Sequence, residues 1–351
     1  MIKEIGGEFY KIPKLNINKK NGIFDLLKGY NYQLFESGRE GFEIINKISN
    51  KKILFPSYAC NSMFQFLKKE NLVFYNVDSN FNIDIKDIEN KLTEDIGILI
   101  FVNYFGKLQN KKILSYLSSL KRKGIIIIED TTHSFFTNVC TVGDYCITSF
   151  RKWFCIPNGG ILYSKRKLLK LEATENIIFS AKREKGFLLK ENYLLKGNIP
   201  KKIFLDLFNE TEEILDKNKK INNISDTSLK ILKEIDVNSL IKKRIENYKY
   251  LYRKLKNIQK IKIYKINIKK EVPLFLIIKL DEKERNSFRK YLIKNKIYCP
   301  IHWPLISELN EEFEVKNFIK NIISIPIDQR YSNKDMKYIY KKISKYFKEK
   351  Y

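Results

Sequence analysis

Two residues near the middle of the chain, Asp130 and Lys152, are of types that could carry covalent catalysis. Asp130 ends the β-branched apolar run Gly124-Ile-Ile-Ile-Ile-Glu-Asp130, which is typical of a buried parallel strand that places a carboxylate at its C-terminal end. A second short apolar run, residues 145–150, leads into Lys152. A lysine can hold an aldehyde as a Schiff base, and a carboxylate can keep a pyridine nitrogen protonated so that the ring accepts electrons. The pair therefore matches the requirements of pyridoxal phosphate chemistry.

The elements that must position these residues alternate between strand and helix patterns. We expect strands at Lys52–Phe55, Leu72–Val77, Ile98–Val102, Ile125–Glu129 and Tyr145–Phe150. Helical patterns separate most of them, at Arg39–Ile48, Asn61–Glu70 and Lys111–Lys123. This alternation predicts an α/β fold with a large, mostly parallel sheet and helices on both faces. Ligands of such sheets bind at the C-terminal ends of the strands, which predicts a site near Pro56, Asn103, Asp130 and Ser149.

The pattern changes after Lys165. Residues 166–250 are lysine-rich and predicted to be helical, and the chain then returns to mixed elements. These are strands at Ile261–Ile268 and Val272–Leu280, a helix at Glu282–Lys294, a short strand at Ile297–His302 and a helix at Asn333–Phe347. We therefore expect a large domain over residues 1–240 and a smaller α+β domain over 241–351. The N-terminal segment 1–34 is a candidate for packing against the small domain.

Composition excludes several classes of protein. The net charge of +27 is spread over the 351 residues, whereas a nucleic-acid site would cluster it, so we predict no nucleic-acid partner but a preference for anionic substrates. Five cysteines without a CxxC pair and only two histidines predict reduced thiols and no metal site. No apolar run is long enough for a transmembrane helix, and no signal peptide is evident. We therefore expect a cytoplasmic protein.

Each candidate site residue also has a purely structural interpretation. Ser37-Gly38-Arg39 opens a predicted helix whose free N–H groups could bind phosphate, or it could be an ordinary helix cap. Asp130 could cap a helix, and His133 could be a satisfied core histidine. Lys152 could be a surface lysine, but the following Trp153-Phe154 is unusual for a solvated face. His302 and Trp303 could form a packed aromatic corner instead of contacting a substrate.

Taken together, the segments resemble the DegT/DnrJ/EryC1/StrS aminotransferases, a sugar-modifying branch of the fold type I pyridoxal-phosphate enzymes. The resemblance runs in order from Ser37 to Lys165 and returns in the last fifty residues. It rests on the following segments: Ser37-Gly38-Arg39, Phe55-Pro-Ser-Tyr-Ala-Cys60, Phe74-Tyr-Asn-Val-Asp78, Val102-Asn-Tyr-Phe-Gly106, Ile128-Glu-Asp-Thr-Thr-His133, Ser149-Phe-Arg-Lys152, Asn158-Gly-Gly160 and Ile323-Ser-Ile-Pro-Ile-Asp-Gln-Arg-Tyr331.

The resemblance implies a role for each matching residue. Lys152 would hold the cofactor aldehyde, Asp130 would pair with the pyridine nitrogen, and His133 would lie beside the ring hydroxyl. The phosphate would be bound by Ser37, Gly38, the backbone of Arg39, and Ser149. Tyr58 or Cys60 takes the position where the family often has an aromatic residue stacked on the ring.

Two departures from the family pattern affect this assignment. The segment between Ser149-Phe150 and the lysine is two residues shorter than in the family, so that counting forward from Ser149 reaches Phe154. Counting back from Gly159-Gly160 reaches Lys152, which we prefer because only a lysine can do the chemistry. The segment around Asn222 and Asn223 only loosely resembles the one that reaches the phosphate of the neighbouring subunit.

The resemblance implies a homodimeric aminotransferase with pyridoxal 5'-phosphate as cofactor. It would move an amino group, with glutamate as the expected donor, to the keto group of a nucleotide-linked sugar for surface polysaccharide synthesis. Arg151, beside the lysine, keeps a small phosphorylated ketone open as the acceptor, and His302 or Trp303 would contact it. A hypothesis from another class is a catalytically silent, basic scaffold of the same fold.

Overall fold

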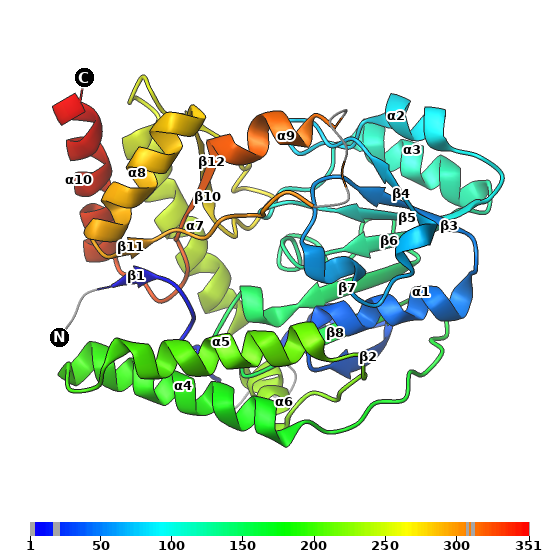
Figure 1. Ribbon diagram of the computed structural model, residues 1–351, viewed down its shortest axis with the longest axis horizontal. Coiled ribbons are helices and arrows are strands. Elements are labelled where there is room, and N and C mark those ends of the chain that lie inside the picture. Colours follow the sequence, from blue (N-terminus) through cyan, green and yellow to red (C-terminus); the bar gives the residue numbers. More distant parts are fainter. Residues whose placement is uncertain (1–3, 17–21, 307–308, 310–312, 351) are drawn as a thin grey trace.

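The computed structural model describes residues 4–16, 22–306, 309 and 313–350, and its largest element is a seven-stranded sheet (Figure 1). The strands lie in the order β2-β8-β7-β6-β5-β3-β4. Their bounds are β2 Asn31–Phe35, β3 Lys52–Pro56, β4 Leu72–Tyr75, β5 Ile96–Val102, β6 Ile126–Asp130, β7 Tyr145–Ser149 and β8 Gly160–Ser164. The pairs from β4 through β7 are parallel, whereas β8 pairs antiparallel with both β7 and β2. The predicted α/β fold with a mostly parallel mixed sheet is confirmed.

The parallel strands place their C-terminal ends at one edge of the sheet. Pro56 ends β3, Asn103 follows β5, Asp130 ends β6 and Ser149 ends β7, as the sequence predicts. All seven residues of β5 are buried, because layers of helices cover a parallel sheet on both faces. The polar residues at the strand ends are thereby the first groups that a ligand at this edge can reach.

Helices α1 (Glu43–Ile48) and α3 (Lys111–Arg122) lie within the expected helical segments, whereas α2 (Ile85–Lys91) was not predicted. The helix α3 begins after Asn110, whose side chain accepts a hydrogen bond from the N–H of Ile113, and it buries Ile113, Leu117 and Leu120. Beyond the sheet, α4 (Ile177–Lys196) and α5 (Lys201–Lys217) pack side by side as a long hairpin, followed by α6 (Asp226–Glu234) (Figure 1).

The C-terminal part contains a three-stranded antiparallel sheet in the order β12-β10-β9, with bounds β9 Lys262–Ile263, β10 Leu276–Lys279 and β12 Ile322–Ile325. Its helices are α7 (Val237–Leu255), α8 (Glu282–Lys294), α9 (Val315–Phe318) and α10 (Asn333–Lys350). The N-terminal strand β1 (Ile5–Gly6) pairs in parallel with β11 (Ile297–Tyr298). A division of the chain at residue 240 stays a prediction, and that position lies within α7.

Several predicted elements were wrong in type or length. The strands expected at Val272–Leu280 and Ile297–His302 are shortened to β10 and β11. The expected helix at Asn61–Glu70 is two 3₁₀ turns, Asn61–Phe64 and Lys69–Asn71, because the carbonyl of Phe66 accepts a hydrogen bond from Asn46 Nδ2 instead (2.6 Å). The expected strand at Ile261–Ile268 is reduced to β9, since the N–H of Ile266 donates to the hydroxyl of Tyr248 (2.9 Å). The start of the helix expected at Arg39–Ile48 is a 3₁₀ turn, Gly38–Phe42, before α1.

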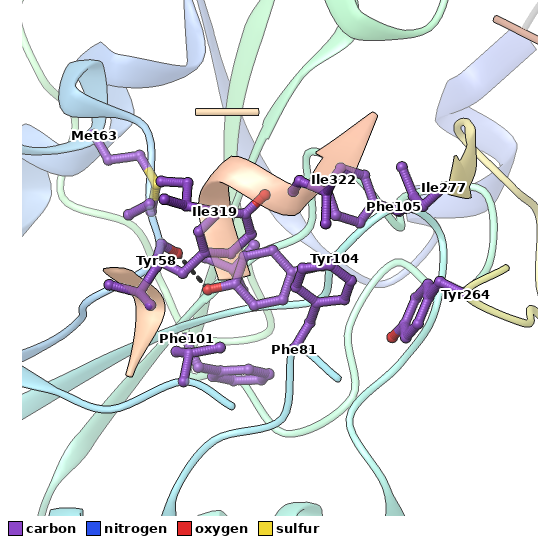
Figure 2. Packing of buried hydrophobic residues seen from close by; sticks show 14 of the residues in the cluster. Tyr58, Met63, Phe81, Phe101, Tyr104, Phe105, Tyr264, Ile277, Ile319 and Ile322 are labelled. Atoms are coloured by element: carbon purple, nitrogen blue, oxygen red, sulfur yellow. Dashed lines mark hydrogen bonds between the residues drawn. The ribbon is translucent and has the colours of Figure 1, made fainter. Parts of the chain in front are cut away.

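Aromatic side chains from both parts of the molecule meet in one buried cluster. Figure 2 shows Tyr58, Phe81 and Tyr104 packed together, with Tyr264 from the C-terminal part beside Phe81. The hydroxyl of Tyr104 donates to the carbonyl of Tyr58 (2.5 Å), which satisfies this buried polar group. The cluster joins the strand-end edge of the large sheet to the C-terminal part of the chain.

In the described part of the chain, no helix is both long and apolar enough to cross a membrane.

Candidate functional site

A cavity lies at the C-terminal edge of the sheet, and we call it the strand-end cavity. Most of the predicted site residues line it: Ser37, Gly38, Arg39, Cys60, Asp130, His133, Ser149, Arg151, Lys152 and Trp303. These residues come from the ends of several strands, from the turn before α1 and from the C-terminal part. The fold thus brings together residues that are far apart in the sequence.

Asp130 is a buried carboxylate with one well-defined backbone partner. Its Oδ1 accepts a hydrogen bond from the N–H of Thr132 (2.7 Å). Burial raises the pKa of this carboxyl to about 6, and the hydrogen bonds from Thr132 and the charge of Lys152 oppose that rise. A cation bound beside the carboxylate would keep it ionised, because an opposite charge favours the charged form. The neighbouring Glu129 faces away, and it accepts hydrogen bonds from the backbone of Thr141, Val142 and Gly143.

Lys152 ends a short 3₁₀ turn, Phe150–Lys152, directly after β7. Its side chain is exposed to the cavity, and no described residue forms a hydrogen bond or an ion pair with its amino group. An unpaired lysine in a cavity is available for covalent chemistry. Phe154, which the alternative alignment would place at this position, is buried in the core.

The turn Ser37–Gly38 packs closely against the end of β7. A Cβ atom on Gly38 would lie 3.1 Å from the Cβ of Ser149 and 3.3 Å from its backbone nitrogen, so that only glycine allows this approach without a shift of the neighbouring chain. The hydroxyl of Ser149 has no hydrogen-bond partner among the described residues. The side chain of Arg39 is turned away and binds Gln65 (2.6 Å) and Asp216 (2.8 Å), which leaves its backbone at the cavity.

His133 and Trp303 form the opposite wall of the cavity, and the ring of His302 packs against both of them. The rings of His133 and Trp303 are stacked, with centroids 5.1 Å apart, and His302 lies 5.6 Å from His133. Burial is the main reason why the pKa of His302 falls to about 3 and that of His133 falls well below its ordinary value. Both imidazoles are therefore neutral at physiological pH. His302 Nδ1 lies 2.8 Å from the hydroxyl of Ser324, which fixes its ring.

Of the two residues predicted for ring stacking, Tyr58 and Cys60, only Cys60 lines the strand-end cavity. Tyr58 is 1% exposed, belongs to the aromatic cluster of Figure 2 and donates its hydroxyl hydrogen to the carbonyl of His302. Tyr58 does not line the cavity because its side chain points into the core, so that of the two alternatives the structure favours Cys60. Trp303, which the sequence suggested as a substrate residue, supplies the aromatic surface at this cavity.

The loosely matching segment around Asn222 makes contacts within its own chain. The side chain of Asn222 donates to Glu36 (3.0 Å), and its backbone N–H donates to Glu40 (3.1 Å). Asn222 is 4% exposed, whereas Asn223 is exposed and binds the carbonyl of Ala173. The amide of Asn222 therefore supports the turn before α1, and only Asn223 has an accessible side chain.

A second cavity, which we call the interdomain cavity, adjoins the first at Arg151 and Lys152. His302 lines it from one side and the N-terminal residues Gly6, Gly7, Glu8 and Phe9 from another. The sequence predicts that segment 1–34 packs against the C-terminal part, but not that its residues line a cavity. The pair Gly6-Gly7 was the only indication in the sequence of this N-terminal arm at the cavity. In the structure both residues have positive φ, of 89° and 66°, which is a conformation that favours glycine.

Arg151 belongs to a chain of alternating charges between the two cavities. It pairs with Glu212 of α5, which also binds Arg183 (3.4 Å), and Arg183 in turn binds Glu8 (2.8 Å). Burial would raise the pKa of Glu8, but Arg183 and Arg151 lower it to about 2. Glu212, which also lines the strand-end cavity, had no sequence signal because acidic residues are common on exposed helices. The chain ties α5 and the N-terminal arm to the turn that carries Lys152.

Comparisons with known proteins agree with this arrangement. The sequence model of the DegT/DnrJ/EryC1/StrS aminotransferase family matches residues 52–344, whereas no curated protein matches the chain. Two similar solved structures are the putative sugar aminotransferase Spr1654 from Streptococcus pneumoniae in its PLP form (TM-score 0.69, 14% identity, 99% of this chain and 99% of that chain) and Helicobacter pylori PseC, an aminotransferase involved in the biosynthesis of pseudoaminic acid (TM-score 0.68, 14% identity, 99% and 100%). A third is the aminotransferase TlmJ from Streptoalloteichus hindustanus (TM-score 0.64, 13% identity, 92% and 88%). At these identities the likeness establishes the fold.

Proposed function

Because the chain belongs to the DegT/DnrJ/EryC1/StrS aminotransferase family, whose cofactor is pyridoxal phosphate, we propose that it transfers an amino group to the keto group of a sugar. In this proposal the sugar is linked to a nucleotide, glutamate is the donor, and the product serves surface polysaccharide synthesis. The expected fold type, enzyme class and cofactor are confirmed by the family match and by the fold. The sugar acceptor is supported by the names of two similar proteins, a putative sugar aminotransferase and one for pseudoaminic acid.

The observation that carries the proposal is that Asp130 and Lys152 face one cavity whose residues fit the cofactor. A buried carboxylate, an unpaired amino group and the closely packed turn at Gly38 lie along its walls. Asp130 would hold the pyridine nitrogen, His133 would lie beside the ring hydroxyl, and Cys60 and Trp303 would contact the ring. The turn Ser37–Arg39 and the hydroxyl of Ser149 would bind the phosphate, since backbone N–H groups and hydroxyls are its usual donors.

When bound, pyridoxal phosphate supplies an electron sink that stabilises negative charge at the carbon next to the transferred nitrogen. Asp130 would keep the pyridine nitrogen protonated, because its carboxylate favours a cation beside it. Lys152 Nζ would hold the cofactor and, once released by the donor, would take the proton from the donor α-carbon and donate it to C4′ of the cofactor. Family members that remove a hydroxyl carry histidine instead of lysine, so Lys152 indicates amino transfer.

The acceptor would enter through the interdomain cavity. Arg151 and Lys152 line both cavities, and His302 lines the second, so that an anionic acceptor would meet positive charge next to the reacting amino group. The same position of Arg151 also suits a small phosphorylated ketone, which we keep as the second candidate acceptor. A guanidinium binds the phosphate of either compound equally well.

The function can be tested with the purified protein. After incubation with pyridoxal phosphate, we expect a visible absorption band that borohydride removes, because borohydride reduces the double bond between Lys152 and the cofactor. Glutamate alone should convert the cofactor to its amino form, and a screen of keto-sugar nucleotides and phosphorylated ketones should return it to the aldehyde. A protein that binds no cofactor would contradict the proposal, whereas a preference for phosphorylated ketones would select the second candidate.

His302→Ala should impair amination of the acceptor about tenfold more than it impairs reaction with glutamate, since a neutral hydrogen-bonding group in the interdomain cavity contacts only the acceptor in this proposal. The measurement is a pair of single-turnover rates, one with glutamate and one with the acceptor. Ser324→Ala is the matched control, because it leaves the imidazole but removes its 2.8 Å neighbour. Equal losses in both half-reactions of His302→Ala would assign this residue a structural role.

We further propose a homodimer with the sites at the subunit interface, as the family membership implies. The described chain exposes several apolar side chains on α4, among them Ile177 (72%), Ile178 (66%) and Leu188 (63%), and such a group is typical of an association surface. Light scattering should give twice the mass of one chain. Leu188→Glu should shift the mass towards the monomer, whereas a monomeric wild-type protein with full activity would contradict the proposal.

A further inference from the structure

Three long-range hydrogen bonds converge on Trp153, the residue that directly follows Lys152. The indole Nε1–H donates to the carbonyl of Thr132 (2.7 Å). The carbonyl of Trp153 accepts from Arg244 Nη2 (2.8 Å) and from Gln329 Nε2 (2.8 Å). Trp153 is 0% exposed. The backbone beside the lysine is therefore held by three segments that are far apart in the sequence.

The bond to Thr132 connects Trp153 with Asp130. The N–H of Thr132 donates to Asp130 Oδ1 (2.7 Å), and its hydroxyl accepts from the N–H of Ser149 (3.1 Å). A shift of the Thr132 carbonyl would move this N–H as well, since both belong to the same short loop after β6. The indole of Trp153 thus connects the turn that carries Lys152 with Thr132, whose N–H donates to Asp130.

Arg244 supports the other side of Trp153 from α7. Its guanidinium donates to the carbonyl of Leu274 (2.9 Å) and to Gln329 Oε1 (3.0 Å), and it lies 4.8 Å from the centre of the Trp153 ring. Burial lowers the pKa of Arg244 to about 10, and the charge of Asp328 opposes that fall. The group therefore stays cationic at neutral pH. Leu274 and Gln329 lie next to β10 and β12, so Arg244 joins the C-terminal sheet to the lysine turn.

The lysine depends on this support because its own side chain makes no such contacts. Lys152 lies in a 3₁₀ turn of only Phe150–Lys152, and no described residue binds its amino group. The backbone of the turn therefore decides from where, and in which direction, this side chain enters the cavity. If Trp153 served only for packing, its ring would be enough; this ring meets Phe136 edge to face, with the ring centres 4.9 Å apart. Packing alone would require neither the hydrogen bond of the indole N–H nor the two hydrogen bonds that the carbonyl accepts.

We propose that Trp153, held by Arg244 and Gln329, is a positioning residue that fixes Lys152 relative to Asp130 and ties both to the placement of the C-terminal sheet. This inference rests on the roles given to Lys152 and Asp130 in the proposed function. It concerns residues that do not themselves touch the cofactor. Small displacements of a reacting group can cost a large part of the rate, so the expected effect is kinetic and spectroscopic.

Trp153→Phe is the decisive variant, because it keeps an aromatic ring and removes the N–H. We expect the pH midpoint of the visible cofactor band to rise by about half to one unit, the effect of one hydrogen bond on a protonation equilibrium. The rise follows because a displaced Asp130 would favour the protonated pyridine nitrogen less, so that the ring would withdraw less electron density from the nitrogen of Lys152, which would then hold its proton more easily. The single-turnover rate with glutamate should fall about tenfold, with little change in the glutamate concentration required for half-saturation.

Tyr75→Phe is the matched control. It also removes one buried donor to a backbone carbonyl, that of Ile100 (2.8 Å), but it does so within the large sheet and away from both cavities. Both variants should lose a similar amount of thermal stability, and only Trp153→Phe should shift the pH midpoint. The proposal would be overturned if the two variants had the same pH midpoint of the cofactor band and the same single-turnover rate with glutamate.

Gln329→Met serves where Trp153→Phe fails to fold, since it changes a partly exposed position and removes one donor to the carbonyl of Trp153 together with one acceptor of Arg244. Its pH midpoint should shift in the same direction by a smaller amount, and an unchanged midpoint would count against the proposal. The proposed function fails separately: a wild-type protein without a borohydride-sensitive band would refute the function. A normal wild-type band that neither variant alters would refute only the role of Trp153.

Discussion

Lys152→Ala is expected to abolish amino transfer, by at least about a thousandfold, and to leave the fold intact. The side chain is exposed to the strand-end cavity and contributes no hydrogen bond or ion pair within the described chain, so its removal should cost little stability. The rate should collapse because the same amino group anchors the cofactor and moves the proton, and general acid–base catalysis alone contributes about 10²–10⁴-fold. Steady-state rates, thermal unfolding and the borohydride-sensitive absorption band measure the three parts of this prediction.

Lys165→Ala is the control for that experiment. Lys165 follows β8, is exposed and lies 5.6 Å from the ring centre of Tyr30, away from both cavities. Its substitution should leave the rate and the absorption band unchanged. If Lys152→Ala kept more than about a few per cent of the wild-type turnover, the assignment of the lysine would be wrong and Lys165 would be the next residue to test.

Asp130→Asn should weaken the binding of pyridoxal phosphate by about ten- to hundredfold, because a charge-assisted hydrogen bond to the pyridine nitrogen is lost. The rate should also fall steeply, since an unprotonated pyridine is a poor electron sink. Asparagine has nearly the same shape, and it can still accept the hydrogen bond from Thr132 at 2.7 Å. Equilibrium titration of the apo protein with the cofactor measures the affinity independently of turnover.

The pH dependence of binding provides a sharper test of Asp130. Burial raises the pKa of this carboxyl to about 6 in the free protein, so that the ionised form that binds a protonated pyridine dominates above that pH. Cofactor affinity should therefore decrease as the pH falls through about 6, and Asp130→Asn should remove this part of the pH dependence. A wild-type affinity that is constant between pH 5 and 7 would contradict the assignment.

Glu129→Gln is the matched control, because Glu129 is the adjacent carboxylate. Its oxygens accept from the backbone of Thr141, Val142 and Gly143, and a side-chain amide can replace only part of these bonds. The variant should lose thermal stability but keep the pH dependence of cofactor binding. If Glu129→Gln rather than Asp130→Asn removed that dependence, Glu129 would be the partner of the ring nitrogen.

The sequence by itself determined the framework of the site. Short apolar strands and amphipathic helices have periods that can be read locally, and β-branched runs such as residues 124–130 mark strands that are buried on both faces. Parallel strands then place their C-terminal ends together, which is why the local pattern alone assigns Asp130, Ser149 and Lys152 to one edge of the sheet. Residues with little regular structure, such as Asn61–Glu70, were misjudged because long-range hydrogen bonds replaced the local pattern.

Only the tertiary structure decided which side chains complete the site. Tyr58 and Cys60 are two residues apart, yet the first points into the aromatic core and the second into the cavity, a choice made by the packing of Trp303 and His302 from the C-terminal part. Glu212 and Arg244 carry no local signal, since a charged residue on a helix normally faces water. Their roles arise from contacts across more than sixty positions with Arg151 and Trp153. Such contacts depend on how the elements pack, because a local pattern specifies a helix or a strand but not its partner.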